Sequence, residues 1–395
     1  MKDKNLRIVI LVIIAVLLTH YGLKLYQAPL ETYTWTELLI NYAAGFIRRG
    51  LIGKIAYWIS PYLSVKFFLS ASITLCYLIH LILYSQIAKK IETFEWALFA
   101  LSPAAFLFPV YDFDAFGRKD VFLILIFMIS FLLILKNVKL TITLPAILSL
   151  YQIGVLIHEY ALFYFPFAIF LILVCYRKAP SRQLIFIAAA GVLFMLVNLY
   201  GLYAFSRRYY NLDLIAESWV GLIKDYDLTP QSGAFGWMGI PLKDGLQPVF
   251  DKLSYPRTFF SYIAGMALAL IPSILLNARY RILDTLREEY QSAPWKLYAF
   301  GLILLVSLPV FMFGSDWGRL TNLFSINIFL SLVVLRESFQ SENTAEVSAA
   351  GSHFYRTAAI LMVVLYAFTW HIKHYVDGDH IALQQGLLFQ IFHWL

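Results

Sequence analysis

Long apolar runs recur along almost the whole chain and are separated by short polar connections. A helix that crosses a hydrocarbon core of about 30 Å needs about 20 mostly apolar residues. The pattern therefore predicts about eleven membrane-spanning helices. They are expected near residues 7–26, 66–88, 95–111, 120–136, 140–159, 161–176, 184–204, 258–277, 297–314, 320–336 and 357–375.

The connections between these runs predict one all-α, polytopic transmembrane bundle over residues 1–395. Residues 27–65 are too polar to span and are expected to form a first outer segment with a short interfacial helix. Residues 205–257 predict one large extracytoplasmic loop, available as a lid. Residues 337–356 are rich in Ser, Glu and Ala and predict a flexible cytoplasmic connection.

The composition is typical of a chain that lies mostly in the lipid bilayer, because 61% of the residues are hydrophobic and only 14% are charged. The net charge of +7 is scattered over loop ends, which argues against a nucleic-acid partner and favours anionic lipid or phosphate. The only cysteines, Cys76 and Cys175, lie in or beside apolar runs. They provide neither a disulfide framework nor a metal cluster.

The distribution of Lys and Arg predicts a cytoplasmic N-terminus and an extracytoplasmic C-terminus. With that orientation, the short inner loops hold the excess of cations that cytoplasmic loops usually carry. These are Lys89, Lys90, Lys136, Lys139, Arg177, Lys178, Arg182, Arg279, Arg281 and Arg287. Six cations then fall on the outer side, where short loops rarely retain them: Arg48, Arg49, Lys54, Arg118, Lys119 and Arg319.

Four charged clusters are predicted to share this outer face. In the first outer segment, Glu31 and Glu37 precede the pair Arg48 and Arg49, which glycines flank. Glycines let the backbone approach a bulky anion, and two guanidinium groups offer forked donors to phosphate oxygens. The alternative is a contact between the arginine pair and lipid head groups.

The second cluster, residues 111–120, contains Asp112, Asp114, Arg118, Lys119 and Asp120. An Asp-x-Asp pair can hold a divalent cation on a phosphate, and the Arg-Lys pair can hold the phosphate directly. The alternative is a self-neutralising salt-bridge cluster at the start of a helix, with Asp120 at its positive end.

The third and fourth clusters lie at helix junctions. His158 and Glu159 are candidates for a general base, or else interfacial anchors. Their spacing is not His-Glu-x-x-His, so no zinc site is predicted. Asp316 and Arg319 are three residues apart and could simply pair with each other. Together the clusters predict one pocket that opens to the outer leaflet, near loop aromatics that include Trp219 and Trp237 and that suit either sugar stacking or an interfacial belt.

In architecture the chain resembles bacterial O-antigen and capsular polysaccharide polymerases of the Wzy type and the wider GT-C class of membrane glycosyltransferases. Arg49 to Gly53 fits the Arg-x-x-x-Gly pattern described for some polymerases. The resemblance implies an enzyme of the bacterial cytoplasmic membrane that assembles a surface polysaccharide from polyprenyl-pyrophosphate-linked sugar units. It also implies other polysaccharide-assembly membrane proteins as partners.

The resemblance agrees with the chemistry of the clustered residues. Arg48, Arg49, Arg118, Lys119 and Arg319 would bind the pyrophosphate, and Asp112, Asp114, His158 and Glu159 are the candidates for the base. Glu31, Glu37, Asp120 and Asp316 would complete the pocket; no metal ligand is assigned, and a divalent cation stays open as a cofactor. Two alternatives stay open: a membrane acyltransferase that modifies glycans, with His158 as its base, and a flippase or other transporter of lipid-linked glycans.

Overall fold

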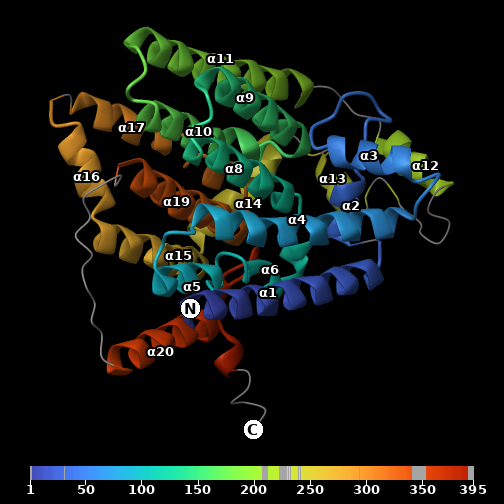
Figure 1. Ribbon diagram of the computed structural model, residues 1–395. Helices are drawn as coiled ribbons and strands as arrows, with labels where there is room; N and C mark the ends of the chain where they lie inside the picture. The colour runs from blue at the N-terminus through green and yellow to red at the C-terminus, as the bar shows by residue number, and fades with distance from the viewer. Residues whose placement is uncertain are drawn as a thin grey trace.

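The computed structural model describes residues 2–30, 32–206, 212–221, 229, 231, 233–238, 240, 242–292, 294–339 and 353–389. Over these residues the chain is mostly helical, with only two short strands (Figure 1). Six helices are long and apolar enough to cross a membrane, which is the architecture of an all-α membrane protein. They are α1 (Lys2–Gln27), α4 (Val65–Ile87), α9 (Leu140–Ile157), α11 (Ser181–Ser206), α15 (Pro256–Tyr280) and α19 (Trp317–Phe339).

The remaining apolar runs form shorter helices or broken ones, so the prediction of about eleven spans exceeds the six that reach this length. The shorter apolar helices are α8 (Asp120–Leu135), α10 (Tyr160–Cys175) and the part of α20 (His353–Thr369) from Ala359 onward. The expected helix 297–314 is divided into α17 (Trp295–Leu305) and α18 (Val310–Phe313), with Pro309 immediately before the second piece.

The expected helix 95–111 is likewise divided, into α5 (Thr93–Ala100) and α6 (Phe108–Tyr111). Pro103 explains the break, because a proline disfavours helical geometry in the residue before it. The freed carbonyls of Ala104 and Ala105 accept hydrogen bonds from Asn322 Nδ2, both at 3.0 Å. The side chains of α19 thus replace hydrogen bonds that a continuous helix would have made itself.

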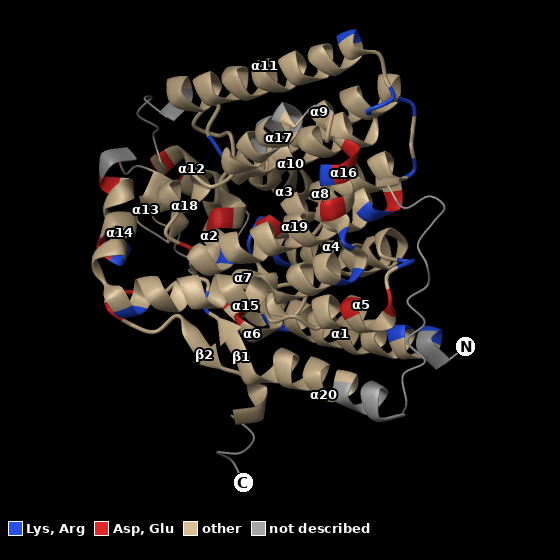
Figure 2. Ribbon diagram, turned by 90° about the vertical axis from the view of Figure 1, so that its left-hand side faces the viewer, with Lys and Arg blue, Asp and Glu red and all other residues tan. Residues whose placement is uncertain are grey.

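The helix α19 is the centre of the bundle, and α11 is at its edge. In α19, 89% of the apolar window is buried, against 17% in α11. Packing partners of α19 include α15, α8 and α10, whereas α11 packs on α10 and α9. In Figure 1, α11 runs along one side of the molecule, and in Figure 2 its ribbon is uncharged except at one end. Its exposed apolar side chains are those of a lipid-facing helix.

Short helices gather at one end of the bundle (Figure 1). Those labelled there are α2 (Tyr33–Leu39), α3 (Leu51–Ile59), α12 (Leu212–Val220) and α13 (Ala234–Met238), while α16 (Ile282–Glu289) lies at the other end. Two further short helices are α7 (Phe113–Phe116) and α14 (Leu242–Ser254), and α14 is labelled near the middle of the same view. The sequence predicted a helix over 357–375, but α20 ends at Thr369 and the chain after it is extended. Strands β1 (Trp370–Ile372) and β2 (Leu383–Gln385) pair antiparallel.

Described parts of the expected lid, 205–257, are fixed to the first outer segment. Trp219 is fully buried and donates from Nε1 to the Leu39 carbonyl at 2.9 Å. Ser218 Oγ accepts from Asn41 Nδ2, also at 2.9 Å. Trp219 therefore anchors α12, and its ring is not free to stack on a sugar. Residues 207–211 and 222–228 of this loop, and 340–352 of the expected connection 337–356, lie outside the described residues.

Candidate functional site: a buried ion-pair network at one end of the bundle

The first outer segment folds back so that its arginine pair faces the bundle. Gly53 allows this approach, because a Cβ there would lie 2.1 Å from the carbonyl oxygen of Ile40. Arg49 has a φ of 63°, in the left-handed region that non-glycine residues rarely adopt. Such strain persists only where surrounding contacts hold it, and it concentrates at functional sites. Lys119 Nζ donates to the Arg49 carbonyl at 2.5 Å and fixes this backbone from the other side.

Glu159 is held by both arginines of this pair. Arg49 donates Nη2 to Oε1 at 2.6 Å and Nε to Oε2 at 2.9 Å, a two-pronged contact. Arg48 donates Nη1 to Oε1 at 3.3 Å. Burial alone would raise the pKa of the Glu159 carboxyl, but the two guanidinium groups and His158 outweigh it and hold that pKa well below its usual range. Glu159 is therefore an anion at neutral pH.

Glu37 lies at the centre of the network and is fully buried. Its Oε1 accepts from Arg49 Nη1 at 3.3 Å, and its Oε2 is 3.1 Å from Nε of Arg118. Burial raises the pKa of this carboxyl, yet Arg118, Arg319 and Arg49 together bring it down to about 2. Glu37 thus links the first outer segment to Arg118, just before α8, and lies within electrostatic reach of Arg319 in α19.

The start of α19 is tied to the start of α8 by a second set of ion pairs. Arg319 donates Nε to Asp120 Oδ2 at 2.5 Å and Nη2 to Oδ1 at 3.0 Å. Asp316 Oδ2 accepts from Arg319 Nη1 at 2.5 Å and from Arg118 Nη2 at 2.9 Å. Burial raises the pKa of Asp316, but these two guanidinium groups lower it well below the usual value. The pairing of Asp316 with Arg319 does occur, within a larger network.

Lys119 is completely buried among these charges. Burial lowers its pKa to about 7, because desolvation and the neighbouring Arg49 outweigh the attraction of Glu37. At neutral pH the network therefore holds four guanidinium groups and a partly charged lysine against four carboxylates, Glu37, Asp120, Glu159 and Asp316. The four guanidinium charges match the four carboxylates, and Lys119 adds to the basic side of the network.

His158 is buried inside the same network and is unsuited to be a base. Its Nδ1 accepts from the backbone N–H of Tyr160 at 3.2 Å, so the ring carries its proton on Nε2, 3.7 Å from Glu37 Oε1. Burial lowers its pKa well below the ordinary value. The ring is neutral and lacks the exposure that an incoming substrate hydroxyl would need.

Asp112 makes a different contact, with a residue that the sequence analysis did not single out. Its Oδ2 accepts from Nδ1 of His374 at 2.8 Å and from the backbone N–H of His374 at 2.7 Å. Burial raises the pKa of Asp112, but its hydrogen bonds with His374 bring it below the usual value. A carboxylate that orients an imidazole leaves Nε2 of the ring available for proton transfer.

Asp114 is exposed and lies near this pair. One ligand atom from each of Asp112, Asp114 and His374 lies within 4.8 Å of the others, a spacing that could hold a cation. Nδ1 of His374 and Oδ2 of Asp112, however, already form a hydrogen bond with each other. A cation ligated by Nδ1 would have to replace that bond, so the described geometry fits a hydrogen-bonded pair better than a metal centre.

The segment that carries His374 is attached directly to α19. Gly318 N donates to the His374 carbonyl at 3.2 Å, and Lys252 Nζ from α14 donates to the Ser315 carbonyl at 2.7 Å. Lys252 also lies over the ring of Tyr375, 3.9 Å from its centre. Burial lowers the pKa of Lys252 to about 8, against the pull of Asp316. The Asp112–His374 pair thus borders the ion-pair network.

A cavity of about 890 Å³ with polar and apolar walls opens near His374, which is not itself among its lining residues. Residues on both sides of His374, Lys373 and Tyr375, contribute to its wall, together with Arg257, Asp377, Asp379, His380, Gln384 and Gln385 among others. Two basic and two acidic side chains balance, so the cavity suits a neutral polar ligand with many hydroxyl groups better than an anion.

Most of the sequence-predicted site residues lie together in one network. Arg48, Arg49, Arg118, Lys119, Arg319, Glu37, Asp120, Asp316, His158 and Glu159 share it, Asp112 and Asp114 lie beside it, and Glu31 lies outside the described residues. His374 and Lys252 were missed, because a lone histidine or lysine in a polar segment carries no motif. No family model, curated protein or solved structure matches the chain.

Proposed function

We propose that the protein is a membrane glycosyltransferase of the polysaccharide-polymerase type, which transfers sugar units from a polyprenyl-pyrophosphate-linked glycan at the outer leaflet of a bacterial cytoplasmic membrane. The observation that carries the proposal is the buried network of four guanidinium groups and a lysine at one end of the bundle, beside a carboxylate–imidazole pair and a cavity. Such a set matches a diphosphate leaving group and a hydroxyl nucleophile.

The arginines would stabilise the leaving pyrophosphate. Arg48 has the most exposed side chain of the four, 34% against 15% for Arg49 and less for Arg118 and Arg319, so it would meet the phosphate first. A diphosphate would then compete with Glu159 for the donors of Arg48 and Arg49. In a buried site of low dielectric, each such charge-assisted hydrogen bond is stronger than in water.

The proton acceptor in this proposal is Nε2 of His374, oriented by Asp112. A hydroxyl oxygen of the acceptor sugar attacks the anomeric carbon while its proton passes to Nε2. The bond between that carbon and the pyrophosphate oxygen breaks, and its electron pair stays on the pyrophosphate. General-base assistance of this kind contributes about 10² to 10⁴ in rate. Glu159 and His158, named as bases from the sequence, would instead shape the anion site, because both are locked in the network.

The two other functions fit the geometry less well. An acyltransferase with His158 as base would need that ring to reach substrate, whereas His158 is fully buried. A transporter would be expected to place its charges deep within several helices and at the centre of the membrane. In this chain the network residues lie where α8, α10 and α19 begin and in the first outer segment.

Deletion of the gene from its host, followed by analysis of the surface glycan, tests the proposal. Single repeat units on the lipid carrier support a polymerase, and a truncated repeat unit supports a transferase that adds one sugar. Intact chains that lack acyl groups would support the acyltransferase. Accumulation of untranslocated lipid-linked glycan would support the transporter. An unchanged glycan would reject all of these functions.

Complementation with single variants tests the assigned roles. Arg118→Gln and His374→Gln should fail to restore long-chain glycan while the protein stays in the membrane at wild-type amounts. Exposed residues of the same types give matched controls: Arg281→Gln and His20→Gln should restore it fully. Normal chain length with His374→Gln would exclude that imidazole as the base.

A further inference from the structure

An apolar groove with a cavity volume of about 210 Å³ opens next to Arg48. Its walls come from α9, from α11 and from the loop before α3. Val155, Leu156, Val197 and Leu202 are among the aliphatic side chains of the walls, and Phe46 and Ile47 complete them beside Arg48. The groove also contains one polar pair, in which Asn198 Nδ2 donates to Gln152 Oε1 at 3.1 Å.

The position of the groove gives access from the side of the bundle instead of from its end. Two of its walls are candidate membrane spans, and α11 is the span with the smallest buried share. Val197 is 60% exposed, and its neighbours Leu193 and Leu196 are also exposed. Figure 1 shows α11 on the outside of the molecule with α9 beneath it. A molecule within the lipid layer could therefore enter this groove without leaving the membrane.

Among the described residues that line the groove, Arg48 alone is charged, and it is the network arginine that can most easily change partner. It gives Glu159 a single bond of 3.3 Å, whereas Arg49 holds the same carboxylate through two bonds of 2.6 and 2.9 Å. If Arg48 turned to another anion, Glu159 would stay paired. Moving Arg319 would instead leave Asp120 without its arginine partner, which is costly.

We infer that this groove binds a long-chain lipid phosphate, with the phosphate on Arg48 and the adjoining apolar chain between α9 and α11. The inference rests on the proposed function and extends it: the groove would be the route by which the lipid carrier reaches the ion-pair network from the side. Groove and ligand are complementary in charge and polarity. The groove has one partly exposed guanidinium, that of Arg48, beside apolar walls, and the ligand has one anionic head on an apolar chain.

Native mass spectrometry of the purified full-length protein with undecaprenyl phosphate tests the inference without any catalytic assay. Two variants should each weaken binding about tenfold or more, the first by loss of a charged hydrogen bond and the second by filling the groove. One is Arg48→Gln. The other is Gly201→Phe, because a Cβ at Gly201 has no atom within 4 Å and a larger side chain would fill the groove without a clash in α11.

Matched controls separate these effects from general damage. Gly301→Phe places the same ring at another open glycine, and Arg182→Gln removes a guanidinium from the opposite end of α11; both should bind like wild type. Equal binding of undecaprenol would show that the phosphate is not recognised, and full competition by inorganic pyrophosphate would show a site for free anions. Either result, or wild-type binding by Gly201→Phe, overturns the inference.

The two proposals fail in different ways. If undecaprenyl phosphate binds as described but gene deletion leaves the glycan unchanged, the groove stands and the glycosyltransferase proposal falls. If deletion abolishes polymer while neither groove variant alters lipid binding or chain length, the transferase stands and the groove is not the route of its carrier.

Discussion

At the scale of single residues, the contact between Arg319 and Asp120 is expected to be the most stabilising ion pair in the network. Asp120→Asn should cost about 3–5 kcal/mol, because it leaves a buried guanidinium with one carboxylate partner instead of two. Asp284→Asn, in the exposed pair with Arg281, should cost no more than about 1 kcal/mol. Thermal unfolding in one detergent measures both, and equal shifts of the midpoint would contradict the assignment.

Glu37 predicts a dependence of stability on pH with a definite sign. Its pKa is lowered from 4.5 to about 2, so the folded state holds fewer protons than the unfolded state between these values. Its stabilising contribution is complete above pH 4.5 and is lost as pH falls toward 2. Glu37→Gln should therefore unfold at lower temperature than wild type at pH 7, and the gap should narrow toward pH 2. A constant gap across this range would argue against an ionised Glu37.

The sequence identified the charged residues but not their partners. Arg48, Arg49, Arg118 and Arg319 stand out because they oppose the usual charge bias of outer loops, a signal that each residue carries by itself. Pairing of Asp120 with Arg319, 199 positions apart, depends on how α8 and α19 meet. His374 has no local signal, since its role comes from Asp112, which is 262 positions away. Long-range contacts of this kind cannot be predicted from one sequence.

At the scale of elements, the close contact between α19 and the segment after β1 positions His374. A Cβ on Gly318 would lie 2.1 Å from the Lys373 carbonyl oxygen, so Gly318→Ala must push the two apart. We expect this variant to lose polymer chain length almost as fully as His374→Gln, measured in the complemented deletion strain. Gly301→Ala, at an open helical glycine, should keep full activity and gain up to about 1 kcal/mol of stability. Normal chains with Gly318→Ala would show that this contact does not position the imidazole.

Element boundaries followed the apolar pattern in several runs and departed from it at Pro103 and Pro309, whereas Pro145 and Pro272 lie inside α9 and α15 without ending them. The runs that became α4, α9 and α15 begin and end close to the predicted residues. The run 95–111 looked continuous in hydropathy, but Pro103 broke it and Asn322 of α19 took over its carbonyls. The pattern records which residues avoid water. It does not record where the backbone finds its hydrogen bonds.

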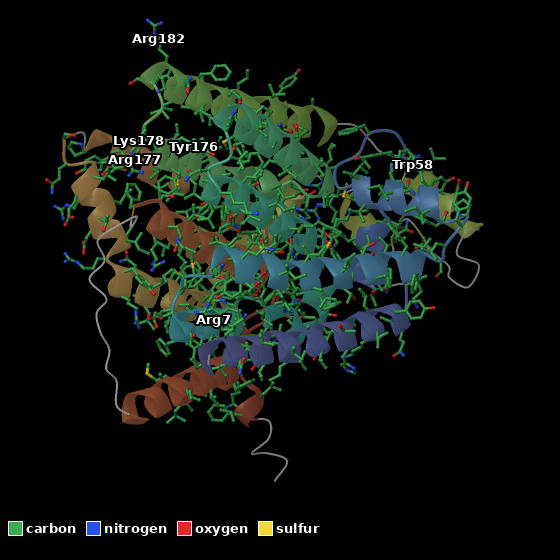
Figure 3. All side chains as sticks on the ribbon, in the orientation of Figure 1. Arg7, Trp58, Tyr176, Arg177, Lys178 and Arg182 are labelled. Carbon is green, nitrogen blue, oxygen red and sulfur yellow. The ribbon has the colours of Figure 1, made fainter. Side chains whose placement is uncertain are left out.

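At the scale of the whole molecule, the two ends of the bundle differ in how they use charge. At one end, guanidinium groups are buried and paired within the network. At the other, Arg7 donates to the Lys89 carbonyl at 3.1 Å, Arg279 to Glu95 at 3.1 Å, and Arg177 to Glu289 at 2.7 Å, and many cations are exposed. In Figure 3, Arg177, Lys178 and Arg182 lie at the left-hand end and Trp58 at the right-hand end. Cytoplasmic ends carry the excess of exposed Lys and Arg, so the left-hand end should face the cytoplasm.

This orientation predicts which single cysteines an impermeant maleimide can reach in intact cells. In a background with Cys76→Ala and Cys175→Ala, Trp58→Cys should be labelled once the outer layers are opened, because that side chain is 63% exposed at the network end. Arg182→Cys, exposed at the opposite end, should be labelled only after the cytoplasmic membrane is permeabilised. The reverse pattern would put the network on the cytoplasmic side, and labelling of both in intact cells would mean that these two positions do not lie on opposite sides of a membrane. Since a lipid-linked glycan is polymerised outside, only the predicted pattern is compatible with the proposed chemistry.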